Sequence, residues 1–136
     1  MRVRLSNQQS EVPVRVRPLQ RLLESALLLL PRPLSADLAK IEVVLIDCAT
    51  MARIHADFLG DPSETDVITF PYGEIVVCPA VAREQGPRFG LEVGHEVLLY
   101  AIHGLLHLAG YDDRTEKEAR EMARIQRRIL NDLTGP

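Results

Sequence analysis

The sequence predicts an α+β fold with a small mixed sheet, and three observations lead to this class. Short β-branched and apolar runs, typical of strands, occur between longer stretches whose apolar residues recur at helical spacing. Two strand-like runs, 67–70 and 74–78, are joined only by residues 71–73, so they are expected to form a hairpin. Strands and helices follow one another in mixed order, which is typical of α+β proteins.

The first half of the chain is expected to hold two strands and two helices. Alternation in residues 1–5 predicts a short first strand, and the β-branched run 41–46 predicts a buried second strand. Residues 18–30 carry apolar side chains at helical spacing, and Pro18 suits the first turn of that helix. A second helical stripe covers residues 49–59 and ends at a turn.

The second half contains the hairpin and two further helices. Residues 90–109 are the longest apolar stretch of helical character, and Gly110 is placed to end this helix in a left-handed cap. Thr115 and Glu118 have the spacing of a capping box, which predicts a last helix over residues 116–132. The expected order is therefore β-α-β-α-β-β-α-α.

Composition and charge exclude several classes of protein. With 46% hydrophobic and 26% charged residues, residues 1–136 are expected to form one globular domain. A net charge of −3 gives no general attraction to nucleic acid, although arginines gather near the N-terminus and in the last helix.

Cys48 and Cys78 lie in apolar surroundings and are expected to be buried, reduced thiols. No apolar run is long enough to span a membrane, so a cytosolic protein is expected.

The segment 103–113 carries the strongest chemical signal. His103 and His107 are four residues apart, so on a helix they project from the same face and can bind one ion. Gly110 permits a positive φ after the last helical turn, which lets the chain turn back and bring Asp113 to the same ion. Three protein ligands leave a fourth position for water, as in catalytic zinc sites. A hydrolytic metal site is therefore expected; the alternative is two histidines satisfied by backbone or solvent.

The residue after His103 argues against one enzyme class. Zinc peptidases place a glutamate there as general base, whereas this chain has Gly104. Peptidase chemistry is therefore disfavoured. No catalytic side chain is identified, and water activated by the metal is expected to supply the nucleophile.

Several other polar residues have structural interpretations. His55 lies on an apolar helical stripe and is expected to be a packing residue. His95 is expected to be structural, with proximity to the metal as the alternative, and Asp66 is expected to cap a turn, with a place in the cleft as the alternative. Glu96 and Tyr100 are candidates to hold the metal ligands in place.

Three segments resemble a known family. Residues 65–71 read Thr-Asp-Val-Ile-Thr-Phe-Pro, 73–75 read Gly-Glu-Ile, and 103–113 read His-Gly-Leu-Leu-His-Leu-Ala-Gly-Tyr-Asp-Asp. In this order they resemble the YbeY family of bacterial endoribonucleases, over about residues 40–130. The resemblance implies a zincin-like α+β fold, with a small mixed four-stranded sheet packed with helices and a metal site on a central helix and the turn after it.

The resemblance also implies a function. A zinc-dependent endoribonuclease specific for single-stranded RNA is expected, acting in 3′-end maturation of small-subunit ribosomal RNA and in ribosome quality control. Expected partners are RNA and the small ribosomal subunit or its assembly factors, in the bacterial cytoplasm, with no membrane and no DNA. Zn²⁺ held by His103, His107 and Asp113 is the expected cofactor, with nickel and iron remaining open. Two alternatives remain: a non-catalytic ribosome-associated RNA- or protein-binding factor with a structural metal and, less favoured, a metalloprotease.

The chain departs from the family pattern at two positions. The last ligand is usually a histidine where this chain has Asp113; a carboxylate also binds zinc, and its charge should make a bound water less acidic. Asp112 is the alternative third ligand. Many members place an RNA-facing arginine six residues before the Thr-Asp-Val segment, where this chain has Leu59, and Arg53 cannot be assumed to replace it. Phosphate contacts would then come from other arginines.

Overall fold

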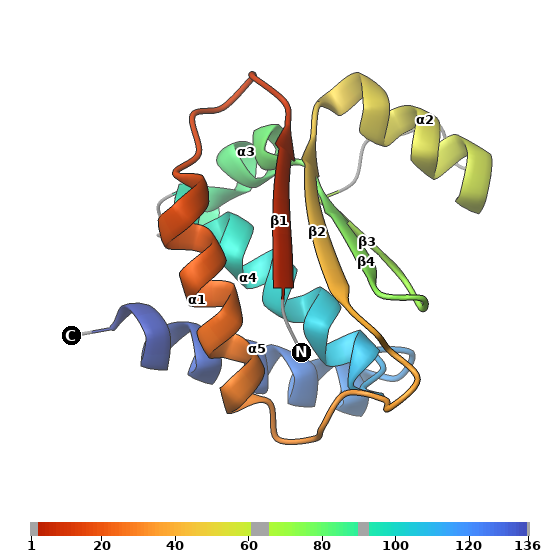
Figure 1. Ribbon diagram of the computed structural model, residues 1–136, viewed down its shortest axis with the longest axis vertical. Helices are drawn as coiled ribbons and strands as arrows, with labels where there is room; N and C mark the ends of the chain where they lie inside the picture. Colours follow the sequence, from red (N-terminus) through yellow and green to blue (C-terminus); the bar gives the residue numbers. More distant parts are fainter. Residues whose placement is uncertain (1–2, 61–65, 90–92, 136) are drawn as a thin grey trace.

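A sheet with helices on both faces organises the molecule (Figure 1). The computed structural model describes residues 3–60, 66–89 and 93–135. The elements in chain order are β1 (Val3–Gln8), α1 (Val16–Leu29), β2 (Ile41–Ile46), α2 (Cys48–Leu59), β3 (Val67–Phe70), β4 (Glu74–Val77), α3 (Pro79–Phe89), α4 (Val93–Leu108) and α5 (Glu116–Thr134). The predicted α+β class with a mixed four-stranded sheet is therefore confirmed.

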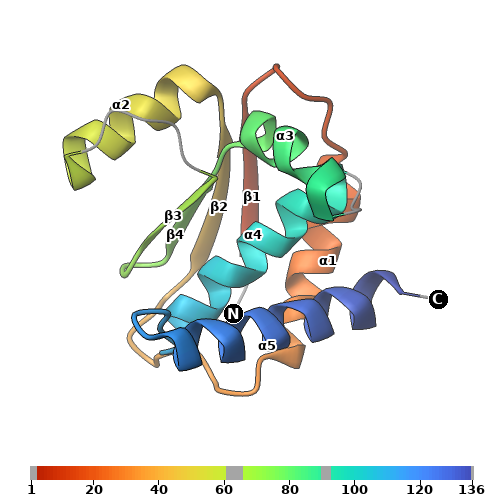
Figure 2. The same ribbon diagram turned by 180° about the vertical axis from the view of Figure 1, so that it is seen from behind.

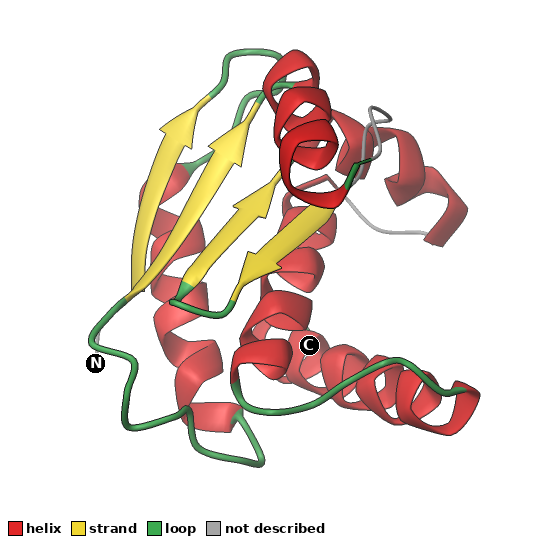
Figure 3. Cartoon of the chain, turned by 90° about the vertical axis from the view of Figure 1, so that its right-hand side faces the viewer, coloured by secondary structure: helices red, strands yellow, loops and turns green. Residues whose placement is uncertain are grey.

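The sheet has the strand order β1-β2-β4-β3. β1, β2 and β4 are parallel, and β3 runs antiparallel to β4 at one edge, as the arrows in Figure 3 show. The predicted hairpin of β3 and β4 is present, with Gly73 at a φ of 114° in its turn. A side chain at this position would also meet the Lys40 carbonyl oxygen at 2.5 Å, so the turn requires glycine.

Strand residues alternate between two apolar clusters because successive side chains point to opposite faces of a sheet. Val43 and Ile75 belong to the larger cluster, which also contains residues of α1, α4 and α5. Val44 and Val76 belong to the smaller cluster on the opposite face, together with Met51 of α2. Figure 2 shows α4 lying against the sheet face that carries the larger cluster. Helix α5 crosses α4 on the side away from the sheet.

Helix α3 was not expected from the sequence, so the predicted element order is wrong by one helix. Pro79 suits the first helical position, but Gly86 and Pro87 lie inside the helix and normally weaken one. Packing outweighs this unfavourable propensity, because α3 contacts α4 and buries Val81 and Ala82. The other predicted elements are present with shifted ends, and the helix expected over 90–109 is described over Val93–Leu108.

Helix α5 begins as the sequence predicts. Thr115 accepts a hydrogen bond from the Glu118 N–H at 3.1 Å, and the Glu118 carboxylate accepts one from the Thr115 N–H at 3.2 Å. Its buried face, with Met122, Ile125 and Ile129, packs against α4. No helix in the described ranges is both long enough and apolar enough to cross a bilayer.

A candidate metal centre at the end of helix α4

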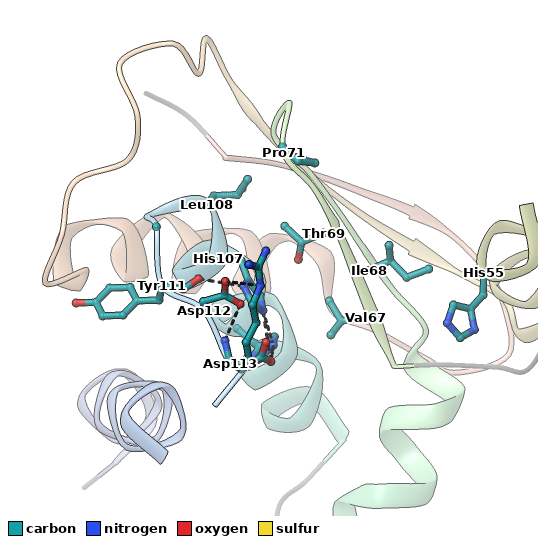
Figure 4. A pocket seen from close by; sticks show the side chains of 13 residues that line it. His55, Val67, Ile68, Thr69, Pro71, His107, Leu108, Tyr111, Asp112 and Asp113 are labelled. Atoms are coloured by element: carbon teal, nitrogen blue, oxygen red, sulfur yellow. Dashed lines mark hydrogen bonds and ion pairs between the residues drawn. The ribbon is translucent and has the colours of Figure 1, made fainter. Parts of the chain in front are cut away.

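The last two turns of α4 and the loop after them bring the predicted ligands together. His103 and His107 project from one face of the helix because they are one turn apart. Gly110 then adopts a φ of 95°, and the Tyr111 N–H donates to the Leu106 carbonyl at 3.0 Å. This left-handed cap reverses the chain. Figure 4 shows the result, with Asp113 returning alongside His107.

The three ligand atoms form a compact triangle. His103 Nε2 and His107 Nε2 are 3.0 Å apart, and Asp113 Oδ2 lies 3.5 Å from the first and 3.6 Å from the second. Ligand atoms about 2.0–2.1 Å from a tetrahedral zinc ion lie about 3.3 Å from one another. The spacing and the nitrogen–oxygen donor set therefore fit one such ion.

Each imidazole ring also makes a hydrogen bond through its Nδ1 atom. His103 Nδ1 lies 2.6 Å from Gln126 Oε1, and His107 Nδ1 lies 3.1 Å from the Tyr111 carbonyl oxygen. A carbonyl oxygen only accepts, so each Nδ1 carries the proton and each Nε2 presents a lone pair. This tautomer is the one that binds a metal through Nε2.

The two aspartates of the turn have different surroundings. Asp112 Oδ1 accepts from the Asp113 N–H at 2.8 Å, and its Oδ2 pairs with Arg114 Nε at 3.0 Å. Asp113 instead directs Oδ2 at the histidines, and its side chain is 43% exposed. The geometry therefore favours Asp113 over Asp112 as the third ligand, while Asp112 orients the turn.

The triangle faces an open cleft of about 780 Å³. One wall is the end of α4 with its turn, and the other is β3 with part of α2 (Figure 4). The lining residues are His55, Val67, Ile68, Thr69, Pro71, His103, His107, Leu108, Gly110, Tyr111, Asp112, Asp113 and Arg114. Arg114 is the one arginine or lysine among these described residues, and its side chain is 85% exposed. The cleft thus combines a candidate metal centre with one accessible cation.

Several expected roles differ in the structure. The partners of the ligands are Gln126 and the Tyr111 carbonyl, not Glu96 and Tyr100. Glu96 is fully buried one helical turn before Tyr100. Burial and the neighbouring Glu96 carboxyl raise the pKa of Tyr100. Gln126 carried a weak sequence signal, because it is a polar residue four positions after Met122 on the apolar stripe of α5.

Of the other polar residues considered in the sequence, one lines the cleft and two lie elsewhere in the fold. His55, expected to be a packing residue, lines the cleft on the side away from His107 (Figure 4). His95 is half-buried and lines a separate hollow near Pro13. Asp66 extends the β3–β4 pairing, since its carbonyl accepts from the Cys78 N–H at 2.9 Å.

Leu59 stands at the position where the family resemblance predicts an arginine, and Arg53 lies upstream of it. Leu59 is the last residue of α2, and its side chain, like Thr65 as a whole, lies outside the described residues. Arg53 is exposed and bonds to Thr50 Oγ1 at 3.3 Å. Arg53 is not among the residues that line the described cleft.

Gly104 is packed against the sheet. A Cβ at this position would lie 2.7 Å from Ile75 Cγ2, so no side chain fits without rearrangement. A glutamate could not be accommodated here as a general base, which agrees with the case against a zinc peptidase.

Comparisons with known proteins support a family assignment. A family model described as Endoribonuclease YbeY matches residues 4–134. A protein of that name from Kineococcus radiotolerans is 39% identical over 110 residues, which covers 68% of this chain and 64% of the relative. One from Rhodococcus opacus is 35% identical over 113 residues, covering 69% and 63%. The chain thus spans less than two thirds of the length of these relatives.

A solved structure has a similar fold. The solution structure of TM1509 from Thermotoga maritima superimposes with a TM-score of 0.69 at 29% identity, covering 98% of this chain and 89% of that one. The family model extends over nearly all of the described elements, from β1 to α5. The chain therefore belongs to the Endoribonuclease YbeY family.

Proposed function

We propose that this chain is a metal-dependent endoribonuclease that cuts single-stranded RNA. The observation that carries the proposal is the convergence of His103 Nε2, His107 Nε2 and Asp113 Oδ2 in an open cleft. The relatives' name, Endoribonuclease YbeY, supports RNA as the substrate. Maturation of the 3′ end of small-subunit ribosomal RNA and ribosome quality control, in the cytoplasm, are the proposed context, with the small subunit or its assembly factors as partners.

Zn²⁺ is the proposed ion, because two imidazoles and one carboxylate at these spacings suit its tetrahedral preference. When bound, it would polarise a phosphoryl oxygen and activate water. The protein's own residues hold the site for that ion. Gln126 and the Tyr111 carbonyl fix the two rings, and the turn at Gly110 fixes Asp113.

Substrate binding is assigned to the cleft beside the metal centre. Arg114 follows Asp113 in the sequence and lines the cleft, and a guanidinium there can neutralise a phosphate of bound RNA. Its ion pair with Asp112 is exposed and therefore weak, so RNA can compete for it. We propose Arg114 as a phosphate contact in a chain that lacks the usual family arginine.

Cleavage of a 5′-labelled single-stranded RNA by the purified protein tests the proposal. We expect internal cuts that stop with a chelator and resume with Zn²⁺. His107→Ala should lose both bound metal and cleavage, whereas His95→Ala, on the same helix but outside the cleft, should keep both. Asp113→Ala should lower metal occupancy.

Two results would decide against this function. Equal cleavage by wild-type protein and His107→Ala would remove the metal from the reaction. Metal-loaded protein that binds RNA but never cuts it would favour the non-catalytic ribosome-associated factor instead.

A further inference from the structure

Three ligand-type side chains meet beyond the carboxyl ends of three strands of the sheet. β1, β2 and β4 are parallel, so their carboxyl ends share one edge. Glu11, Cys48 and Cys78 follow these strands within three residues of each strand's end. Figure 1 shows the segments that carry them at the upper end of the sheet, while the last turns of α4 lie at the lower end. Their ligand atoms lie within 4.8 Å of one another.

The two sulfur atoms have the spacing of metal ligands. Cys48 Sγ and Cys78 Sγ are 3.6 Å apart. Two thiolates about 2.3 Å from one tetrahedral zinc ion lie about 3.8 Å apart, whereas a disulfide requires about 2.05 Å. The sulfurs, which share a thiol hydrogen bond at this distance, are therefore already close to the spacing of two ligands of one ion, whereas a disulfide would bring them about 1.5 Å closer.

Glu11 is positioned as a third ligand. Its Oε1 accepts a hydrogen bond from the Cys48 N–H at 2.9 Å, which fixes the carboxylate beside the sulfurs and leaves its second oxygen for an ion. Glu11 is exposed and Cys48 is half-buried, so solvent can reach the cluster although Cys78 is fully buried. Water can then take the fourth position.

A metal ion would have to displace the proton of the buried Cys78 thiol, so the surroundings of this sulfur affect binding. Burial raises the pKa of the Cys78 thiol, and the Glu11 carboxylate adds to this effect, whereas the N–H groups of Val81 and Ala80 at the start of α3 act in the opposite direction. N–H groups of a first helical turn stabilise a thiolate. Arg83 adds a positive charge nearby, with Nη1 3.4 Å from the Glu11 carbonyl oxygen.

We propose that Glu11, Cys48 and Cys78 form a second metal site, for Zn²⁺ or another divalent ion that prefers thiolates. The ion would tie the loop between β1 and α1 to the first turns of α2 and α3. This site is independent of the His103 centre and of the proposed ribonuclease activity.

Cobalt substitution distinguishes the two sites, because only thiolate ligands give Co²⁺ an intense charge-transfer band in the near ultraviolet. Reduced wild-type protein should bind two equivalents of Co²⁺ and show the band. His107→Ala should bind one equivalent and keep the band. Cys48→Ser should bind one equivalent and lose it.

Glu11→Gln provides a second variant, because its amide oxygen can still accept from the Cys48 N–H and the fold should be unaffected. It should weaken Co²⁺ binding at the thiolate site by roughly tenfold or more. Circular dichroism checks that Glu11→Gln and Cys48→Ser are folded. Two results would overturn the proposal. The first is reduced wild-type protein that binds one equivalent of Co²⁺ and shows no charge-transfer band. The second is protein that forms a Cys48–Cys78 disulfide when stoichiometric Zn²⁺ is present, instead of binding the ion.

Discussion

Replacing Gly104 by alanine is expected to destabilise the protein through one identifiable contact. A Cβ on Gly104 would lie 2.7 Å from Ile75 Cγ2 and 2.9 Å from both Cγ1 and Cδ1. Apolar carbon atoms normally pack about 3.5–4.0 Å apart. Ile75 is fully buried, and β4 is paired on both sides, so neither the side chain nor its strand has room to move away.

The magnitude follows from two opposing effects. Overpacking a filled core costs about 1–3 kcal/mol, and the upper part of that range applies because three atoms of one side chain are crowded. Alanine favours a helix over glycine by about 1 kcal/mol. Gly104→Ala should therefore lower the free energy of unfolding by about 1–2 kcal/mol.

The same substitution should change sign in an Ile75→Ala background. Ile75→Ala alone should cost about 2–5 kcal/mol, but it removes all three crowding atoms. Only the helical gain then remains, so Gly104→Ala should stabilise this variant by about 1 kcal/mol. The effect of Gly104→Ala should thus differ between the two backgrounds by about 2–3 kcal/mol.

Urea unfolding of the four proteins, followed by circular dichroism, measures this coupling. Gly94→Ala is the matched control on the same helix, because nothing lies within 4 Å of its Cβ position. It should leave stability unchanged or raise it slightly. An equal loss from Gly104→Ala in both backgrounds would refute the reasoning, since the contact with Ile75 would then not be the cause.

Four further outcomes are expected. Gln126→Met keeps the side-chain length but loses the acceptor, and should weaken metal binding by about 10–100-fold in chelator competition; unchanged affinity would show that the bond is dispensable. Arg114→Ala should weaken RNA binding and reduce the slope of log affinity against log salt by about 1 in anisotropy titrations, whereas Arg114→Lys should retain the slope. Thr115→Ala removes the cap of α5 and should cost about 1 kcal/mol in urea unfolding; a loss near zero would contradict the capping role. The hydrogen bond from the Thr50 N–H lowers the pKa of Asp47 below 3.8. The stability that this hydrogen bond contributes is therefore present above pH 3.8 and is lost as the pH falls through the lowered pKa. The stability difference between wild type and Asp47→Ala should accordingly shrink in acid unfolding experiments.

The sequence predicted the parts of the site that depend on local geometry. His103 and His107 meet because a helix repeats every 3.6 residues, and Gly110 turns the chain because it adopts a positive φ. Asp113 then falls within reach after only three residues. The geometry of a helix and of the turn after it depends only on residues close together in the sequence. The positions of these side chains can therefore be predicted without knowledge of the rest of the fold.

Features that depend on packing between distant segments could not be read in this way. Gln126 contacts His103 only because α5 packs across α4, and nothing at position 126 specifies that crossing. His55 has an ordinary position on an apolar stripe, yet α2 places it at the cleft. Helix α3 contains two residues that disfavour helices and is stabilised by its contact with α4.

The division between local and distant contributions predicts how variation should act on the metal centre. All three proposed ligands come from residues 103–113, so this segment alone determines whether an ion can be held. Gln126, and Ile75 against Gly104, determine how firmly that segment is held. Substitutions of the ligands should lower metal occupancy most strongly, whereas those in the second group should reduce affinity by smaller factors because the ligand atoms themselves remain. Asp113, which stands where the family resemblance predicts a histidine, belongs to the first group; because its carboxylate oxygen lies at the third corner of the triangle, we expect the site still to hold an ion.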